Sequence, residues 1–581
     1  MRAVVANLIF ITLGLASCGG SGGIDSPDWN PPASTSFSVS AQAIKTLVFR
    51  WESVPSATHY RLLEDLDGDA GPQTEAPIAE PLAGQQSFTL DDVFLPARVN
   101  ARYRLQACNG TRCKNVARAG IEGIDGGIGY FKASNPAARD QFGEGLAMSA
   151  DGQLLAVGAP SEDGLNEGID STPNRGAADT DVGAVYVFHR GAVGWVQEAY
   201  LKPAKAMPGA EFGFRLALAC PANNGCTLLV GSPQDSSTGS GVGTQPDTSS
   251  SIASSGAVHM FDRDAQGQWT QTAYIRAQSP TVNAQFGKSV SLSNDGTWAA
   301  VGHPDGPGGS RVSVYQRLPG GWTFWQELQG SNTDGDDAFG EVVRLDPEGE
   351  TLVVGAWSED NSTDNLASVD NASSASGAVY VFQRESSNQW HERAYLKAPE
   401  RRANGYFGYP VTLSSKGQTI VVGEPGDYTN SEPTKGRVHV FRKQGASWVH
   451  ETTVFTSPLP AARGSFGERL ALSADGSTLA IANAYEDSSG SGLTAPPMLV
   501  NTLRYTGTVY LYRRTGAGSW SSPTPIKAPN SGFDLYFGWS LALSADGGAL
   551  AAYGSDHSIS SGIGGNQNDS TAHWAGAVYL Y

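Results

Sequence analysis

Seven aspartates could place carboxylates on one face of this protein, because each follows a short apolar segment at nearly the same point of a repeated pattern. Carboxylates gathered in this way can bind calcium, and a pair of them can act as acid and base. The alternative is that aspartates at strand ends accept hydrogen bonds within turns. Both interpretations apply to one set of residues: Asp163, Asp235, Asp305, Asp360, Asp427, Asp487 and Asp556.

The loops that hold these aspartates are strongly acidic. They span residues 161–182, 234–255, 305–310, 358–376, 426–435, 485–506 and 555–575, and they contain 19 acidic and three basic residues, a net of −16 against −18 for the whole chain. Such a concentration of charge predicts a negative field over one face. A cationic partner or calcium fits that field, and nucleic acid does not.

The elements that must position these residues repeat seven times. Each unit opens on a Phe-Gly pair and closes on a strand such as GAVYVF. Recurrence of short alternating strands is the signature of a radial or stacked repeat fold. The pairs begin at Phe142, Phe212, Phe286, Phe339, Phe407, Phe466 and Phe537, and the closing strands begin at Gly183, Gly256, Arg311, Gly377, Gly436, Gly507 and Gly576.

Each unit divides into four strands, of which the fourth resembles WxxxAYLKA. Only six copies of that strand follow the Phe-Gly pairs, because the chain ends at Tyr581 on the third strand of the last unit. The missing copy lies earlier, at residues 129–133, as GYFKA. The sequence therefore predicts an all-β fold: a seven-bladed β-propeller with N-to-C strand closure, preceded by a small β-sandwich.

The Phe-Gly pairs, the Gly158-Ala159-Pro160 segment and the GAVYVF strands together resemble the FG-GAP repeat of integrin α-subunits and their bacterial relatives. The resemblance covers residues 121–581 and implies a propeller that takes part in adhesion or assembly. Integrin-type blades carry a DxDxDG calcium loop, whereas this chain has short turns such as SADG there. The integrin-like calcium sites are therefore not carried over.

The residues before the repeats indicate export and anchoring. Residues 1–17 form a signal peptide, and Leu15-Ala16-Ser17-Cys18 resembles a bacterial lipobox, which implies a lipid on Cys18. Residues 18–34 are a flexible tether, and residues 35–120 resemble a fibronectin type III-like β-sandwich. We expect a lipid-anchored protein of the cell envelope, at the outer membrane or cell surface, with contact to the membrane through the anchor only.

The other four cysteines fall into two close pairs, Cys108 with Cys113 and Cys220 with Cys226. In an oxidising compartment each pair is expected to form a disulfide.

The sequence contains no HExxH, P-loop or GxSxG motif. We therefore expect a non-enzymatic binding or adhesion module that presents its acidic propeller face to a protein or glycan. Two alternatives remain open: a glycosidase or lyase that uses carboxylates of this face, and a structural subunit of an envelope complex.

Overall fold

The computed structural model describes residues 29–32, 34–68, 75–171, 173, 179–222, 225–243, 245–305, 309–363, 371–426, 436–459, 464–498 and 503–581. Within these ranges the protein is built from strands, with short 3-10 helices η1 (Leu95–Arg98), η2 (Ile124–Gly127) and η3 (Ser415–Gly417). None of the helices described is long and apolar enough to cross a membrane.

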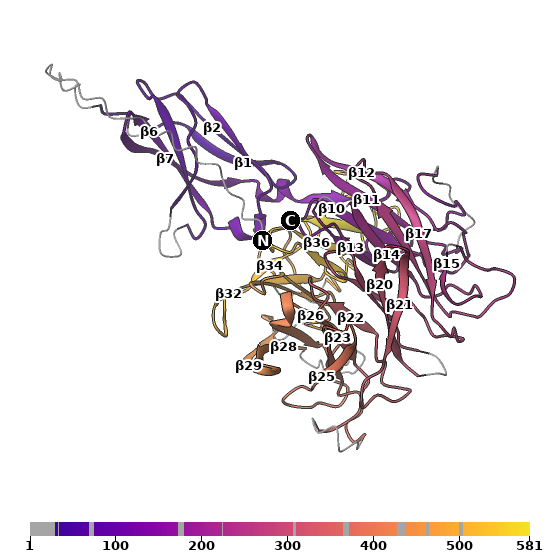
Figure 1. Ribbon diagram of the computed structural model, residues 1–581. Coiled ribbons are helices and arrows are strands. Elements are labelled where there is room, and N and C mark those ends of the chain that lie inside the picture. Colours follow the sequence, from indigo (N-terminus) through magenta and orange to yellow (C-terminus); the bar gives the residue numbers. More distant parts are fainter. Residues whose placement is uncertain are drawn as a thin grey trace, which may run out of the picture.

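The N-terminal strands form a unit that projects from the ring of blades (Figure 1). Their order is β4-β3-β6-β7-β1-β2-β5, and the long β7 pairs with both β6 and β1 and so joins the two halves. The strands are β1 (Phe37–Ala43), β2 (Thr46–Trp51), β3 (His59–Asp65), β4 (Ala76–Ala79), β5 (Ser87–Leu90), β6 (Arg102–Asn109) and β7 (Arg112–Glu122).

The first three blades follow the predicted four-strand pattern from the inner to the outer edge. Blade 1 holds β9 (Gly145–Met148), β10 (Leu154–Ala159), β11 (Ala184–Gly191) and β12 (Gly194–Leu201). Blade 2 holds β13 (Arg215–Ala219), β14 (Cys226–Ser232), β16 (Ala257–Arg263) and β17 (Trp269–Arg276), with β15 (Gly241–Gly243) added at its outer edge. Blade 3 holds β18 (Ser289–Leu292), β19 (Trp298–His303), β20 (Arg311–Leu318) and β21 (Gly321–Leu328).

The next three blades repeat this order. Blade 4 holds β22 (Val342–Leu345), β23 (Thr351–Ala356), β24 (Ala378–Arg384) and β25 (Trp390–Leu396). Blade 5 holds β26 (Val411–Leu413), β27 (Thr419–Glu424), β28 (Arg437–Gln444) and β29 (Ser447–Thr456). Blade 6 holds β30 (Arg469–Leu472), β31 (Thr478–Asn483) and β32 (Thr508–Gly516), and its outer strand is split into β33 (Ser519–Trp520) and β34 (Thr524–Ile526).

The last blade closes the ring as predicted. It holds β35 (Leu541–Leu543), β36 (Leu550–Gly554) and β37 (Ala577–Leu580), and its outer strand is β8 (Gly129–Phe131). Tyr130 pairs with Tyr579 across this junction. The all-β, seven-bladed propeller predicted from the sequence is therefore confirmed, and no blade edge is left open where the chain starts and ends its circuit.

The Phe-Gly pairs hold neighbouring blades together. All seven phenylalanines are buried, and Phe142, for example, packs edge-on against Tyr186 with ring centroids 5.3 Å apart. The backbone of a pair can also approach a neighbouring blade closely: the carbonyl oxygen of Gly213, in the second pair, would lie 2.0 Å from a Cβ placed on Gly158 of the preceding blade. The repeated Phe-Gly signal is thus explained by packing between blades.

The N-terminal unit packs against the propeller at the end opposite the Phe-Gly pairs. The buried Lys45 ammonium donates to the carbonyl of Gly548, which lies in the turn between β35 and β36. Gln153, in the corresponding turn of blade 1, donates to Asp92. The end of the propeller that carries the Phe-Gly pairs, called the top face below, is left uncovered by these contacts.

Candidate functional site

The predicted aspartates that the structure describes do not converge, because each of them makes its contacts within its own blade. In blades 1, 4 and 6 the aspartate accepts backbone N–H groups where the loop returns to the third strand. Asp163 accepts from Thr180 at 2.7 Å, Asp360 from Ala375 at 2.5 Å, and Asp487 from Tyr505 at 2.8 Å. Through these bonds the aspartates cap turns, which was the alternative to their forming a ligand site.

In blades 1 and 4 the preceding glutamate makes the more buried contact, an ion pair with the lysine that ends the fourth strand. Glu162 lies 2.6 Å from Lys202, and Glu359 pairs in the same way with Lys397. In blade 6 Glu486 is buried and accepts from Tyr510, and it is one of the charges that act on Lys527. The recurring lysine of the AYLKA strand was the sequence signal for these pairs.

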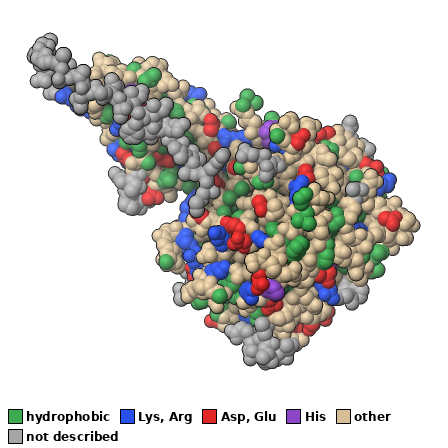
Figure 2. All heavy atoms as spheres, in the orientation of Figure 1, with side chains coloured by type: hydrophobic (Ala, Val, Ile, Leu, Met, Phe, Trp, Pro, Cys, Tyr) green, Lys and Arg blue, Asp and Glu red, His purple; other side chains and the backbone are tan. Residues whose placement is uncertain are grey.

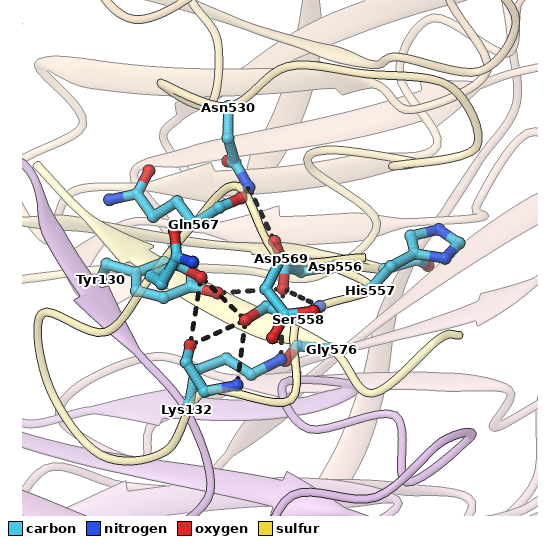
Figure 3. Close-up of polar contacts among 12 residues, drawn as sticks. Tyr130, Lys132, Asn530, Asp556, His557, Ser558, Gln567, Asp569 and Gly576 are labelled. Atoms are coloured by element: carbon cyan, nitrogen blue, oxygen red, sulfur yellow. Dashed lines mark hydrogen bonds and ion pairs between the residues drawn. The ribbon is translucent and has the colours of Figure 1, made fainter. Parts of the chain in front are cut away.

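In blades 2 and 7 the predicted aspartate itself takes the glutamate's place. Asp235 is buried 3.5 Å from Arg276. Asp556 is buried 3.2 Å from Lys132 and also accepts from Tyr130 at 2.9 Å and from Asn530 at 2.7 Å. Figure 3 shows Lys132 and Tyr130, from the strand that closes the ring, reaching Asp556 on the last blade.

The two remaining aspartates of the set lie elsewhere. Asp305 is 42% exposed and lies 3.4 Å from Lys288, and Asp427 lies outside the described residues. On the face seen in Figure 2, acidic side chains are scattered among basic ones. Calcium binding at the acidic loops stays a prediction, since the described aspartates occupy separate blades and do not form one cluster.

Both predicted disulfides are present. Cys108 is bonded to Cys113 at the hairpin between β6 and β7, and Cys220 to Cys226 across the turn between β13 and β14. Cys18, the predicted lipid attachment site, lies outside the described residues.

A second set of residues, which the sequence analysis missed, lies at the top of the inner strands. These are the residues that directly follow each Phe-Gly pair, and unlike the pair they differ from blade to blade. They are Glu144, Phe214, Lys288, Glu341, Tyr409, Glu468 and Trp539. We call them the axial ring. Variation at one position of an otherwise repeated motif was the signal that could have found them.

Two hollows open among these residues on the top face, and both are lined by Trp539. The first has a volume of about 270 Å³ and is lined by Trp357, Tyr406, Tyr409 and the charged side chains of Glu341, Glu468 and Arg469, among others. The second has a volume of about 380 Å³ and is lined by Glu144, Phe214, Tyr485, Tyr536, Tyr553 and Trp574, among others. We call the two together the axial funnel.

Glu468 has the most unusual environment in the funnel. Its side chain is buried at 4% exposure, and one carboxylate oxygen accepts from the Ala484 amide at 2.7 Å. Burial raises the pKa of Glu468 to about 7, although Arg469 and the Ala484 amide act in the opposite direction. A carboxyl group with such a pKa can both give and take a proton near neutral pH.

The neighbours of Glu468 are held in fixed positions. The Arg469 guanidinium lies over the rings of Tyr409 and Trp539, at 5.3 and 4.7 Å from their centroids, and donates to the Tyr409 hydroxyl. The Trp539 indole donates to Glu144 at 3.3 Å, and Lys288 pairs with Glu341 at 3.2 Å. The funnel therefore combines aromatic walls with a small number of placed charges, as ligand sites do.

Comparison with known proteins gives only distant likenesses. No protein-family model and no curated protein sequence matches the chain. Among solved structures, the periplasmic gluconolactonase PpgL of Pseudomonas aeruginosa is 16% identical, with 69% of this chain and 95% of that chain covered and a TM-score of 0.37. A Mycobacterium tuberculosis puromycin-hydrolyzing peptidase is 13% identical, with 76% and 53% covered and a TM-score of 0.37. The WD40 domain of SCAP from fission yeast is 11% identical, with 75% and 81% covered and a TM-score of 0.37.

These comparisons correct one expectation from the sequence. The chain lacks familiar catalytic motifs, and on that basis it was predicted not to be an enzyme. This prediction is wrong, because the solved structures similar to the chain include a gluconolactonase and a peptidase. At these identities and TM-scores the likeness assigns no function, and the chemistry of this chain must be argued from its own residues.

Proposed function

We propose that the protein is a carbohydrate-active enzyme of the cell envelope that hydrolyses a glycosidic bond in the axial funnel. The observation that carries the proposal is the placement of Glu468, a buried carboxyl group beside Arg469 in a hollow whose other walls include Trp357, Tyr409 and Trp539. Aromatic rings offer flat apolar surfaces with polar edges, which suit sugar rings, and a single buried acid suits proton transfer to a glycosidic oxygen.

The reaction needs a second carboxyl group, and Glu341 lines the same hollow. Glu468 donates its proton to the leaving oxygen as the bond between that oxygen and the anomeric carbon breaks. A water molecule adds its oxygen to the anomeric carbon and gives one proton to Glu341. One water is consumed for each bond broken, and exchange with solvent restores both carboxyl groups.

The proposal also covers the location of the enzyme and the families to which its two domains are related. A lipid on Cys18 anchors it in the envelope, residues 18–34 act as a tether, and residues 35–120 form a fibronectin type III-like spacer. The propeller, residues 121–581, belongs with FG-GAP repeats. The lipobox-like residues and the repeated Phe-Gly pairs support these assignments. Replacement of Cys18 by serine should release the protein to the soluble fraction, and unchanged membrane association would refute the anchor.

The test of the enzymatic proposal is release of reducing ends from a panel of neutral and acidic envelope polysaccharides. We expect cleavage of at least one substrate class, and a loss of at least about 100-fold in kcat for Glu468→Gln. Glu211→Gln is the matched control, since burial raises the pKa of Glu211 to about 7 but its side chain does not line either hollow.

Two results would contradict the proposal. The first is full activity in Glu468→Gln, and the second is no cleavage of any member of the panel. A product with the ultraviolet absorbance of an unsaturated sugar acid would show elimination instead of hydrolysis, and would overturn the role given to water and Glu341.

A further inference from the structure

A third hollow opens on the top face, over the last blade. Its volume is about 440 Å³, and it is lined by the loop between β36 and β37 and by the connection that leads from β34 into β35. Its polar side chains include Gln567, Asn568 and Asp569, and Figure 3 shows Gln567 and Asp569 close to Asp556. The ring of Phe533 forms part of the wall and is 56% exposed. The hollow therefore offers hydrogen-bond donors and acceptors beside an exposed aromatic ring.

A row of three adjoining rings joins this hollow to the axial funnel. Trp574 lines the second hollow of the funnel and stacks on His573, with ring centroids 4.8 Å apart. His573 lies 4.4 Å from His557, which lines the third hollow. The first and second hollows already share Trp539. The three hollows therefore follow one another from the axial ring to the loops of the last blade, and we call them together the top track.

The top track carries the most exposed aromatic side chains that the structure describes. These are Phe533, at 56%, and Trp574, at 38%. Trp357 and Trp539 line the first hollow, so an aromatic ring is available in each of the three. Large aromatic rings left in water beside a hollow are typical of surfaces that bind a ligand. A row of such rings suits a ligand made of several similar units.

The charges along the second and third hollows indicate that the ligand is not an anion. Glu144 pairs with Arg215 at 3.1 Å, and Asp556 with Lys132 at 3.2 Å. Asp569 lines the third hollow and adds a negative charge. Among the residues that the structure describes, no lysine or arginine lines either hollow. A carboxylate or sulfate on the ligand would therefore lack a cation there and would be repelled by Asp569.

We propose that the substrate of the axial funnel is a neutral saccharide chain of several units, bound along the top track. The inference rests on the proposed function and adds the length and the charge of its substrate. Each sugar ring of such a chain presents an apolar face to an aromatic ring, and its hydroxyl groups can bond to Gln567, Asn568 and Asp569. Units far from the bond that is cleaved then contribute to binding.

The experiment measures binding by titration calorimetry with Glu468→Gln as the background, so that bound saccharide is not turned over. The probes are cello-oligosaccharides and N-acetylchito-oligosaccharides of two and six units, and an oligogalacturonide of six units. In at least one neutral series the hexamer should bind at least about tenfold more tightly than the dimer, because the longer chain reaches more of the aromatic rings. The oligogalacturonide should bind at least about tenfold more weakly than that hexamer.

Variants of the two exposed aromatic residues locate the chain on the track. Phe533→Ala and Trp574→Ala should each weaken binding of the hexamer by about tenfold, and should change binding of the dimer by less than about twofold. Val193→Ala is the control, since Val193 is 97% exposed in the hairpin between β11 and β12, at the opposite end of the propeller, and it should leave both affinities unchanged. If Trp574→Ala fails to fold, Phe533→Ala supplies the same comparison.

The outcomes separate this inference from the hydrolase proposal. Equal affinity for dimer and hexamer, no binding of any hexamer, or unchanged binding in the folded aromatic variants would overturn the inference even if a polysaccharide is cleaved. Binding of the oligogalacturonide as tight as that of the neutral hexamers would overturn the assignment to a neutral chain. Length-dependent binding that is lost in Phe533→Ala, without cleavage of any polysaccharide by the wild type, would support the inference and overturn the hydrolase proposal.

Discussion

Removing one partner of the buried ion pair between Lys202 and Glu162 should destabilise the propeller strongly. Both side chains are at most 3% exposed, and the ammonium lies 2.6 Å from the carboxylate. Lys202→Met leaves the buried Glu162 side chain without its cation, and the donors that the structure describes at its carboxylate are then the neutral side chains of Asn135 and Tyr200. Breaking a buried pair in this way costs about 3–5 kcal/mol.

That free energy can be converted into a change in melting temperature. If the propeller of roughly 450 residues melts as one unit, its unfolding entropy is about 1 kcal/mol per degree. Lys202→Met should therefore lower Tm by about 3–5 °C. The double variant Glu162→Gln with Lys202→Met removes both charges and keeps at position 162 a side-chain oxygen that can accept from Asn135 and Tyr200, so it should recover most of the loss.

The assay is differential scanning calorimetry at a fixed scan rate, with a surface pair as control. Lys205 and Glu167 lie 3.1 Å apart but are 54% and 43% exposed. Lys205→Met should shift Tm by less than about 1 °C, because exposed pairs contribute little. Equal shifts for Lys202→Met and Lys205→Met, or a double variant as unstable as Lys202→Met alone, would refute the reasoning that an unpaired buried charge destabilises the propeller.

Two further predictions concern stability. Because burial raises the pKa of Glu468 from 4.5 to about 7, the folded state binds its proton more tightly than the unfolded state, and stability should fall as pH rises from about 4.5 through 7, by up to about 3 kcal/mol. Calorimetry across this range should show a smaller decline in Glu468→Gln, and an identical pH profile would contradict the assignment. Gly158→Val should lower Tm or prevent folding, because its Cβ would lie 2.0 Å from the Gly213 carbonyl, whereas Gly84→Ala, with no atom within 4 Å of its new Cβ, should be nearly neutral in limited proteolysis and calorimetry. Similar behaviour of the two variants would show that the blades can separate to admit a side chain.

Features of the fold that depend on repetition could be predicted from the sequence. A Phe-Gly pair performs the same packing task in every blade, so its recurrence revealed the number of blades. The early GYFKA segment revealed the closing strand because it matches the outer strands of the other blades. The pair Cys220 and Cys226 replaces an otherwise regular turn, and this made its disulfide predictable.

The roles of individual carboxylates could not be predicted in the same way. Sequence spacing placed Asp163 beside Glu162 but did not show which of the two faces the blade interior. That choice depends on the lysine of the outer strand, which is far away in sequence and meets the glutamate only after the blade has formed. Asp556 has the buried role and Asp163 the capping role, although both follow the second strand of a blade.

The axial ring was missed because recurrence was used as the measure of importance. A position that performs the same packing in seven blades must keep the same residue type, so repetition marks structure. In the proposed site on the axis the blades contribute different groups, such as a carboxyl group from Glu468 and an aromatic surface from Trp539. In a closed ring of repeats, the residues that contact a ligand on the axis should therefore be those at which the blades differ, and this difference identifies the funnel more directly than any conserved feature of the repeat.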